Sequence, residues 1–178
     1  FGVTTPLRAF ADRLAAVKSG DLRAPLQLES TPEVEWLATS FNEMAKRLQD
    51  SLKQADSDVR RSVDSINTLT ATIGKLNQQI GDAPTGADIE PLRDQLDVAL
   101  QSLSKLTDIS VITHPNGTAD IAIGGGRALV VGKSTFDLTV TNAPGTGLAE
   151  VRAGGIDITA QLEGGAIEVQ TSSGKALP

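Results

Sequence analysis

A heptad pattern of apolar residues across positions 34–80 is the feature that most limits how this chain can fold. Two positions of each heptad share one helix face, and thirteen of the fourteen residues there are apolar, with Ser62 as the exception. One position holds Ala38, Ala45, Leu52, Val59, Ile66, Ile73 and Ile80, and the other holds Val34, Phe41, Leu48, Ala55, Ser62, Leu69 and Leu76. The pattern predicts one helix of about 47 residues, roughly 70 Å long. Because such a helix is rarely stable without neighbours, we expect partners along this apolar seam.

A shorter helix is predicted before the long one, over residues 4–19. Pro6 follows two threonines, which is typical of a helix start, and Gly20 suits a helix end because glycine readily adopts positive φ. The apolar stripe of this helix consists of Leu7, Phe10, Leu14 and Val17. Its spacing of three and four residues indicates a helix with one buried face.

The connector between these two helices carries apolar residues at regular offsets. Leu22, Leu26 and Leu28 recur in it, and Pro25 prevents a helix from running through it. A short polar loop would suffice to join the helices, so we expect the connector to run back along them and pack on them. Glu33 then opens the long helix, where a carboxylate complements the positive end of the helix dipole.

The pattern changes after the long helix. Residues 81–88 form a turn-rich loop, and a further helix over residues 89–106 is expected to fold back on the long one. Its stripe consists of Ile89, Leu92, Leu96, Leu103 and Leu106, widened by Ala99 and Leu100. From position 109 the period becomes two, and the candidate strands read ISVIT, TADIAI, RALVVG, FDLTVT, LAEVRAG, IDITAQL and AIEVQT, with turn signals between several of them. The predicted fold class is α+β, with a small antiparallel β unit attached to a helical stalk.

Composition excludes several classes of function. The chain has 178 residues and a net charge of −6 without a basic block, which argues against nucleic acid as its partner. It has no cysteine and one histidine, so disulfides, thiolate sites and histidine-based metal clusters within one chain are excluded. No apolar run is long enough to span a membrane. We expect no cofactor, and because the chain begins at Phe1 we expect it to be part of a longer protein.

Four local patterns invite a functional interpretation, and each has a simpler one that we favour. His114 lies in a predicted hairpin loop without a recognisable catalytic partner. The glycines at 124–126 lack the Gly-Lys-Ser/Thr ending of a phosphate loop and fit a hairpin turn. Residues 116–118 match the pattern of a glycosylation acceptor, and we interpret them as an Asn-Gly turn. Asp94 and Asp97 share a helix face without a group that would tune them for catalysis, so we interpret them as solvated or ion-paired carboxylates.

The first fifty residues resemble a HAMP domain, the relay module of bacterial membrane receptors and histidine kinases. The resemblance rests on Pro6, on Gly-Asp-Leu at residues 20–22, on Leu26 four residues after Leu22, on Glu33, and on Phe-Asn-Glu-Met at residues 41–44. It implies a parallel homodimer in which two chains form a four-helix coiled coil, with Leu22 and Leu26 anchoring the connector. The residues expected to form and couple this relay are Pro6, Leu7, Leu14, Gly20, Leu22, Leu26, Glu33, Leu37, Phe41, Asn42, Met44 and Leu48.

Residues from about 55 to 165 are similar to another family, the first flagellar hook-associated protein, which joins hook to filament. The segments that carry the similarity are residues 66–80, 92–111, 116–132 and 154–165. They include INTLTATIGKLNQQI and LRDQLDVALQSLSKLTDISV, of which the second is the more specific. The terminal helices with which such axial proteins assemble lie outside this similarity.

Two hypotheses about function follow. The first is a non-enzymatic signalling relay at the cytoplasmic face of the inner membrane, with a membrane span upstream and an output partner downstream. The alternative is a structural flagellar protein located in the extracellular flagellum. The expected domains are a relay at 1–53, a long helix with a returning helix at 54–108 and a β domain at 109–178. A natural and an engineered fusion both fit the unbroken heptad register.

Overall fold

The computed structural model describes residues 4–18, 22, 25–27, 32–143 and 148–162, with the side chains of 4–7 and 18 left aside. The chain divides into two compact units. Unit 1 comprises residues 1–57 and 144–148, and unit 2 comprises residues 58–143 and 149–178.

The long helix predicted from the heptad pattern is confirmed. Helix α2 spans Pro32–Gly81, 50 residues, and Glu33 and Glu35 lie in its first turn. Helix α1 spans Thr4–Lys18, in agreement with the predicted helix before Gly20. The first part of α2 belongs with α1 in unit 1, whereas the part from residue 58 onward belongs to unit 2.

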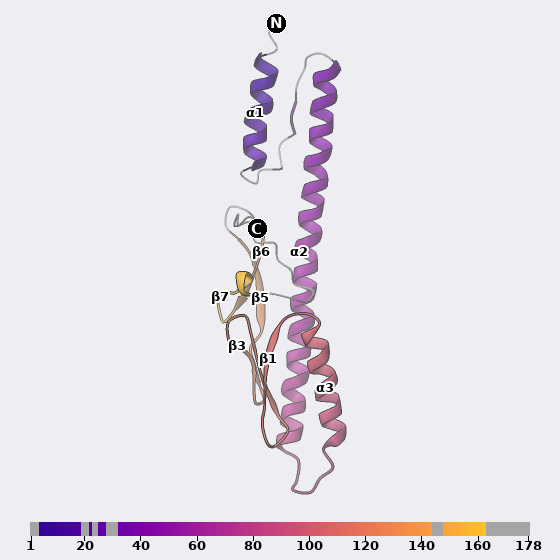
Figure 1. Ribbon diagram of the computed structural model, residues 1–178, viewed down its shortest axis with the longest axis vertical. Coiled ribbons are helices and arrows are strands. Elements are labelled where there is room, and N and C mark those ends of the chain that lie inside the picture. The colour runs from indigo at the N-terminus through magenta and orange to yellow at the C-terminus, as the bar shows by residue number, and fades with distance from the viewer. Residues whose placement is uncertain (1–3, 19–21, 23–24, 28–31, 144–147, 163–178) are drawn as a thin grey trace, which may run out of the picture. The chain divides into compact units, whose positions relative to one another are not determined.

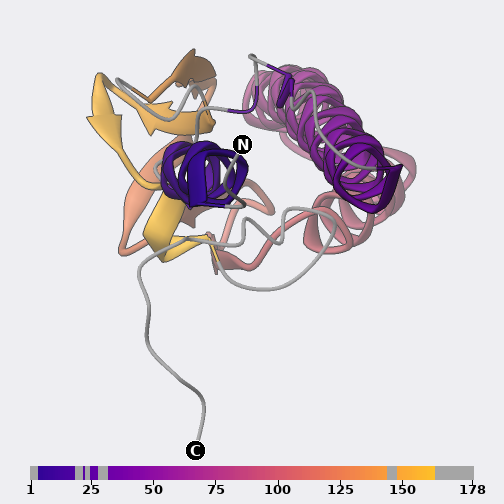
Figure 2. The ribbon, with the colours of Figure 1, turned by 90° about the horizontal axis from the view of Figure 1, so that it is seen from above.

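Unit 2 is built on a helical hairpin backed by strands. Helix α3, Glu90–Ser104, returns along the C-terminal part of α2, as predicted, and the strands lie on one side of this helix pair (Figures 1 and 2). The core draws apolar side chains from α2, α3 and both sheets. Its buried members include Val63, Ile66, Ile73, Leu76, Ile80, Leu96, Ala99, Leu103, Ile121, Ile123, Leu129, Val130, Leu138, Val151 and Ile158. The C-terminal part of the seam is therefore buried by the same chain.

The described strands form two antiparallel sheets, which confirms the α+β class. Sheet A contains β1 (Ile109–Thr113), β2 (Ala119–Ile123), β3 (Arg127–Val131) and β4 (Ser134–Thr135) in that order. Sheet B contains β5 (Leu138–Asn142), β6 (Ala149–Ala153) and β7 (Ile156–Asp157) in that order. Both sheets are simple meanders, so each strand pairs with its neighbour in sequence.

A bulge between β2 and β3 explains why two consecutive side chains of β3 are buried. Ile121 pairs with Val130 and Ala122 pairs with Ala128, so Leu129 is the extra residue. An extra residue in one strand interrupts the alternation of side chains between the two faces. Leu129 and Val130 both enter the core as a result.

Two details of the predicted β unit are wrong. Strand β4 was not predicted, and only the first two residues of IDITAQL form a strand before the 3₁₀ helix Thr159–Gln161. The reason is local hydrogen bonding: the Asp157 carboxylate accepts bonds from both the amide and the hydroxyl of Thr159, which turns the backbone out of the sheet. The segment AIEVQT lies outside the described residues.

Two asparagines of α2 fasten the sheets to the helix. Asn67 Nδ2 donates to the Leu138 carbonyl and Asn67 Oδ1 accepts from the Leu138 amide, both at 2.9 Å. Asn77 Nδ2 donates to the Ala119 carbonyl at 2.7 Å, and Asn77 Oδ1 accepts from the Ala119 amide at 3.0 Å. Asn77 Nδ2 also donates to the Gly132 carbonyl at 2.7 Å. Asn67 thus takes the place of a strand neighbour at the outer strand β5, whereas Asn77 connects the start of β2 to Gly132, the residue after β3.

Close approach of the β3–β4 turn to α2 depends on Gly74. A Cβ at this position would lie 2.7 Å from the Thr135 methyl carbon and 3.2 Å from the Lys133 carbonyl oxygen. Glycine lowers helix stability by about 1 kcal/mol relative to alanine. Its presence within α2 is explained by the space that the turn requires.

We expect Asn77→Ala to lower the free energy of unfolding of unit 2 by roughly 3 kcal/mol, because it leaves the buried amide and carbonyl of Ala119 and the half-buried carbonyl of Gly132 without this partner. Gln78→Ala changes an exposed neighbour on the same helix and serves as the control. Urea unfolding followed by circular dichroism measures both. Equal stability of the two variants would contradict the proposed importance of this carboxamide.

Candidate assembly surface

Unit 1 is held together around one residue of the connector. Leu26 is buried with Ala38 and Phe41 of α2, and Phe10 and Val17 of α1 pack against this cluster. The rings of Phe10 and Phe41 meet edge to face with centroids 5.4 Å apart, a favourable arrangement. The connector therefore packs on the helices at this point.

Asn42 fixes the connector backbone by the pairing also seen in unit 2. Its Oδ1 accepts from the Leu26 amide at 2.8 Å, and its Nδ2 donates to the Leu26 carbonyl at 2.9 Å. Both peptide groups of Leu26 are thereby satisfied while its side chain is buried.

The remaining residues singled out from the sequence fall into three groups. Leu22 and Leu37 are half-buried, and Leu14, Glu33, Met44 and Leu48 are exposed in the single chain. Gly20 and the side chains of Pro6 and Leu7 lie outside the described residues. The structure thus gathers Leu26, Phe41 and Asn42 into one cluster, whereas Met44 and Leu48 lie outside it.

An apolar stretch of α2 is exposed in the described part of the chain. The side chains of Met44, Leu48 and Leu52 are 55%, 45% and 38% exposed, and we call these three residues the open stripe. Before it the seam is buried at Phe41, and after it Val59 packs against the core of unit 2. Leu48 and Leu52 belong to the heptad seam and Met44 lies beside it, so the open stripe is an exposed apolar part of α2 between these two buried regions.

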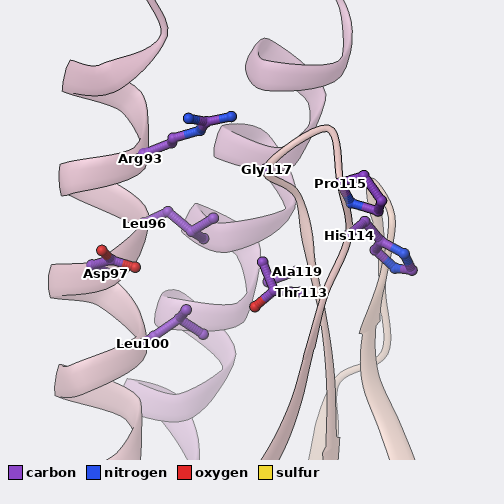
Figure 3. A pocket seen from close by; sticks show the side chains of 9 residues that line it. All are labelled: Arg93, Leu96, Asp97, Leu100, Thr113, His114, Pro115, Gly117 and Ala119. Atoms are coloured by element: carbon purple, nitrogen blue, oxygen red, sulfur yellow. The ribbon is translucent and has the colours of Figure 1, made fainter.

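A shallow hollow of about 310 Å³ lies in unit 2 between α3 and the β1–β2 hairpin (Figure 3). Leu96 and Leu100 point from α3 toward the hairpin, while His114 points away from α3. Arg93 lies against the turn, and a Cβ on Gly117 would come within 2.6 Å of its Nε, so glycine is needed there for this contact. Arg93 also pairs with Glu90 at 2.8 Å. The hollow is a packing seam between a helix and a hairpin turn.

His114 has a carboxylate partner that sequence reasoning missed. Its Nε2 lies 2.9 Å from Asp120 Oδ2, and Asp120 Oδ1 accepts from the Gly132 amide at 2.7 Å. The bond from Gly132, and then the bond with His114, hold the pKa of the Asp120 carboxyl below its ordinary value. Asp120 thus links the β1–β2 turn to the β3–β4 turn, a structural role.

The other local patterns have the structural roles that we favoured. The glycines at 124–126 form the β2–β3 turn, all with positive φ. Asn116 Oδ1 accepts from the amide and the hydroxyl of Thr118, and Gly117 has φ of 89°, so this segment is an asparagine-stabilised turn. Asp94 and Asp97 are exposed on α3.

Asn67, Asn77 and Asp120 were not identified from the sequence. The signal that could have found the asparagines is their position beside the seam residues Ile66 and Leu76, where a polar side chain must find a partner or reach solvent. Asp120 lies on the less buried face of β2, where its residue type gives no indication of its bonds. Within the described residues, no group of three or more acidic, histidine or cysteine side chains is arranged to hold a metal ion.

A helical hairpin backed by two meandering sheets and fastened by side-chain bonds to backbone defines a structural module. The family described as the flagellar hook-associated protein FlgK helical domain matches residues 2–174. This chain belongs to that family.

Three comparisons illustrate the relationship. The chain is 31% identical over 107 residues to flagellar hook-associated protein 1 of Escherichia coli K12, covering 58% of this chain and 20% of that protein. It is 29% identical over 109 residues to the Salmonella typhimurium LT2 protein of the same name, covering 60% of this chain and 20% of that protein. The fold is similar to that of the flagellar hook junction protein FlgK from Burkholderia pseudomallei, with a TM-score of 0.60, 21% identity, and coverage of 91% of this chain and 31% of that one. The chain thus spans about a fifth of the length of the curated relatives it matches.

The prediction of a signalling relay is wrong. The flagellar family match extends from residue 2 and includes the whole segment assigned to a HAMP domain, for which the comparisons give no support. Assignment to a membrane receptor is not supported either, and no helix in the described ranges is both long and apolar enough to cross a membrane. The physical reason is that an apolar stripe, a helix-ending glycine and a leucine-bearing connector describe helix packing in general, so they do not distinguish a relay from a structural bundle.

The bonds to Asp120 predict a defined dependence of stability on pH. A carboxyl whose pKa is lowered on folding stabilises the protein above its unfolded pKa of about 4, and this contribution is lost as the pH falls through the folded pKa. We therefore expect the difference in unfolding temperature between the native chain and Asp120→Asn to be largest near neutral pH and to shrink below about pH 4. A difference that stays constant down to about pH 2 would show that the carboxylate charge is not involved.

Leu26→Ala tests the connector contact. Removing a buried leucine should destabilise unit 1 by about 2–4 kcal/mol, because the cavity beside Phe41 cannot fully collapse. Hydrogen exchange of the α2 amides around Phe41 should accelerate, while the amides of unit 2 keep their protection. Gln27→Ala, at an exposed neighbour, is the control, and identical exchange in both variants would reduce the connector to a simple loop.

Proposed function

We propose that this chain is part of a structural, non-enzymatic protein of the bacterial flagellum that acts at the junction of hook and filament. The observation that carries the proposal is the family match over residues 2–174, supported by the names of the curated relatives. Its partners would be neighbouring protein subunits of the flagellum, and its location the flagellum itself.

The chemistry of the described polar groups fits this role. Three asparagines, His114 and Asp120 bond to the backbone or to each other and hold elements in place. An axial protein must transmit mechanical load between neighbours, and carboxamide bonds between helix and strand resist sliding because both partners are fixed in geometry. The proposal therefore assigns these residues to stiffness rather than to catalysis.

Flagella purified by shearing from the source bacterium test the role. The protein should be present in the sheared fraction in a small, fixed ratio to the filament subunit, and deletion of its gene should abolish attached filaments. Recovery of the protein with the cell envelope, and normal filaments after deletion, would contradict the proposal.

We also propose that the open stripe pairs with its counterpart in a second chain to form a parallel homodimer. Met44, Leu48 and Leu52 recur every four residues, so they form a narrow apolar line on one side of α2. In a parallel coiled coil each seam residue meets the same residue of the partner, and the heptad register of Leu48, Leu52 and Ala55 suits this arrangement. The domain boundaries expected at residues 53 and 108 remain part of this proposal.

Leu48→Glu should convert the dimer into a monomer, because two carboxylates would face each other across an apolar seam. Sedimentation equilibrium at micromolar concentration measures the mass, which should fall from twice the chain mass to the chain mass. Lys53→Glu places the same side chain at an exposed position of α2 and should leave the dimer intact. A native chain that sediments as a monomer would contradict the dimer and leave the flagellar role standing.

A further inference from the structure

The sheet edges in unit 2 differ in how they are covered. The outer edge of β5 faces α2: Asn67 bonds the amide and the carbonyl of Leu138, and Arg60 donates to the side chain of Asn142. β4 lies against Gly74 of α2 and β7 has two residues. β1 is the remaining outer strand, five residues long, and no hydrogen bond to its outer edge is recorded in the part of the chain that the structure describes.

The register of the hairpin shows which backbone groups of β1 face outward. The His114 amide donates to the Thr118 carbonyl, so residues 114 and 118 form a hydrogen-bonded pair. Because bonded and non-bonded pairs alternate in an antiparallel ladder, the amides and carbonyls of Ile109, Val111 and Thr113 point away from β2. Ala119, opposite Thr113, has its groups turned to Asn77, which agrees with this assignment.

The side chains of β1 leave this edge unprotected. The strand reads Ile-Ser-Val-Ile-Thr and lacks charge, proline and bulge, the usual devices that prevent a second strand from adding. Val111 is 40% exposed and Ile112 is 64% exposed. Apolar residues at consecutive positions place exposed apolar surface on both faces of the strand.

We propose that β1 pairs antiparallel with β1 of a second copy of this chain, with Val111 on the two-fold axis. Val111 then meets Val111 of the partner subunit, and Ile109 meets the partner's Thr113, so the outward-facing groups of both strands bond to each other. On the other face Ile112 lies beside the partner's Ser110, where the small serine leaves room for the larger side chain. Sheet A of one copy and sheet A of the other then form one continuous sheet.

The residues just beyond the two ends of β1 are polar groups that complement each other in the same register. Continuing the pairing by three residues from the axis places Asp108 opposite the partner's His114, and the reverse contact forms at the other end. These positions are non-bonded pairs of the new ladder, where side chains approach most closely. Asp108 and His114 both have exposed surface, so each end of the interface brings the carboxylate of one copy beside the imidazole of the other, whose Nε2 already pairs with Asp120 of its own chain.

This surface belongs to unit 2 and is independent of the open stripe in unit 1. Single cysteines test it directly, because the native chain has none. Val111→Cys should give a covalent dimer under mild oxidation, since residues facing each other in a bonded pair have Cα atoms about 5.5 Å apart, within disulfide range. Val131→Cys, on β3 and 48% exposed, is the matched control. Its yield of covalent dimer should be at least tenfold lower, roughly the background from random collision. The result should persist in the Leu48→Glu background, which removes pairing through α2.

A second pair of variants tests the register. Val111→Lys places two ammonium groups directly opposite each other and should weaken association in the Leu48→Glu background roughly tenfold. Ile112→Lys removes a comparable apolar side chain but faces the partner's Ser110, so it should weaken association less. Equal crosslinking at positions 111 and 131, or equal effects of the two lysines, would overturn the proposal.

Discussion

A carboxamide that pairs with a peptide group is the interaction on which this structure depends. α2 carries the three asparagines, Asn42, Asn67 and Asn77, and each uses its oxygen and its nitrogen to bond the amide and the carbonyl of one residue elsewhere in the chain. A carboxamide has the donor and acceptor geometry of a peptide bond, so it can stand where a neighbouring strand would stand. Apolar contact brings the helix and the strands together, but it is non-directional. The asparagine hydrogen bonds are directional, so they fix the orientation of each segment and its position along the axis of α2.

The elements of the fold could be predicted from the sequence to a large extent. The heptad pattern predicts α2 because its thirteen apolar seam positions leave no other period, and the change to period two marks the start of the strands at Ile109. The bulge at Leu129 could not be predicted from the sequence. Consecutive apolar residues fit either a strand buried on both faces or a strand in which the alternation of side chains between faces is interrupted. The turn at Asp157 was missed for a similar reason, since its cause is a side-chain bond to Thr159 that period does not encode.

What covers the seam was harder to predict than the seam itself. Periodicity identifies an apolar face but not its partner, and for Ile66, Ile73 and Leu76 the partner is the same chain. The same limit explains the incorrect relay hypothesis, because Leu26, Phe41 and Asn42 do form a packed cluster, yet such packing is compatible with many functions. Family membership, which rests on most of the chain at once, decided between the two.

Gly74 shows how the requirements of two elements are reconciled at one position. α2 by itself would be more stable with alanine there, since a methyl group restricts the unfolded backbone. The methyl would occupy the place of the Thr135 side chain and press on the Lys133 carbonyl, next to the glycine whose carbonyl Asn77 holds. Helix propensity and sheet contact therefore select opposite residues, and the sheet contact prevails. Because Gly74 has no side chain, the sheet can approach the helix backbone closely at this position. Substitution at this site of α2 is therefore limited by a turn some sixty positions further along the chain.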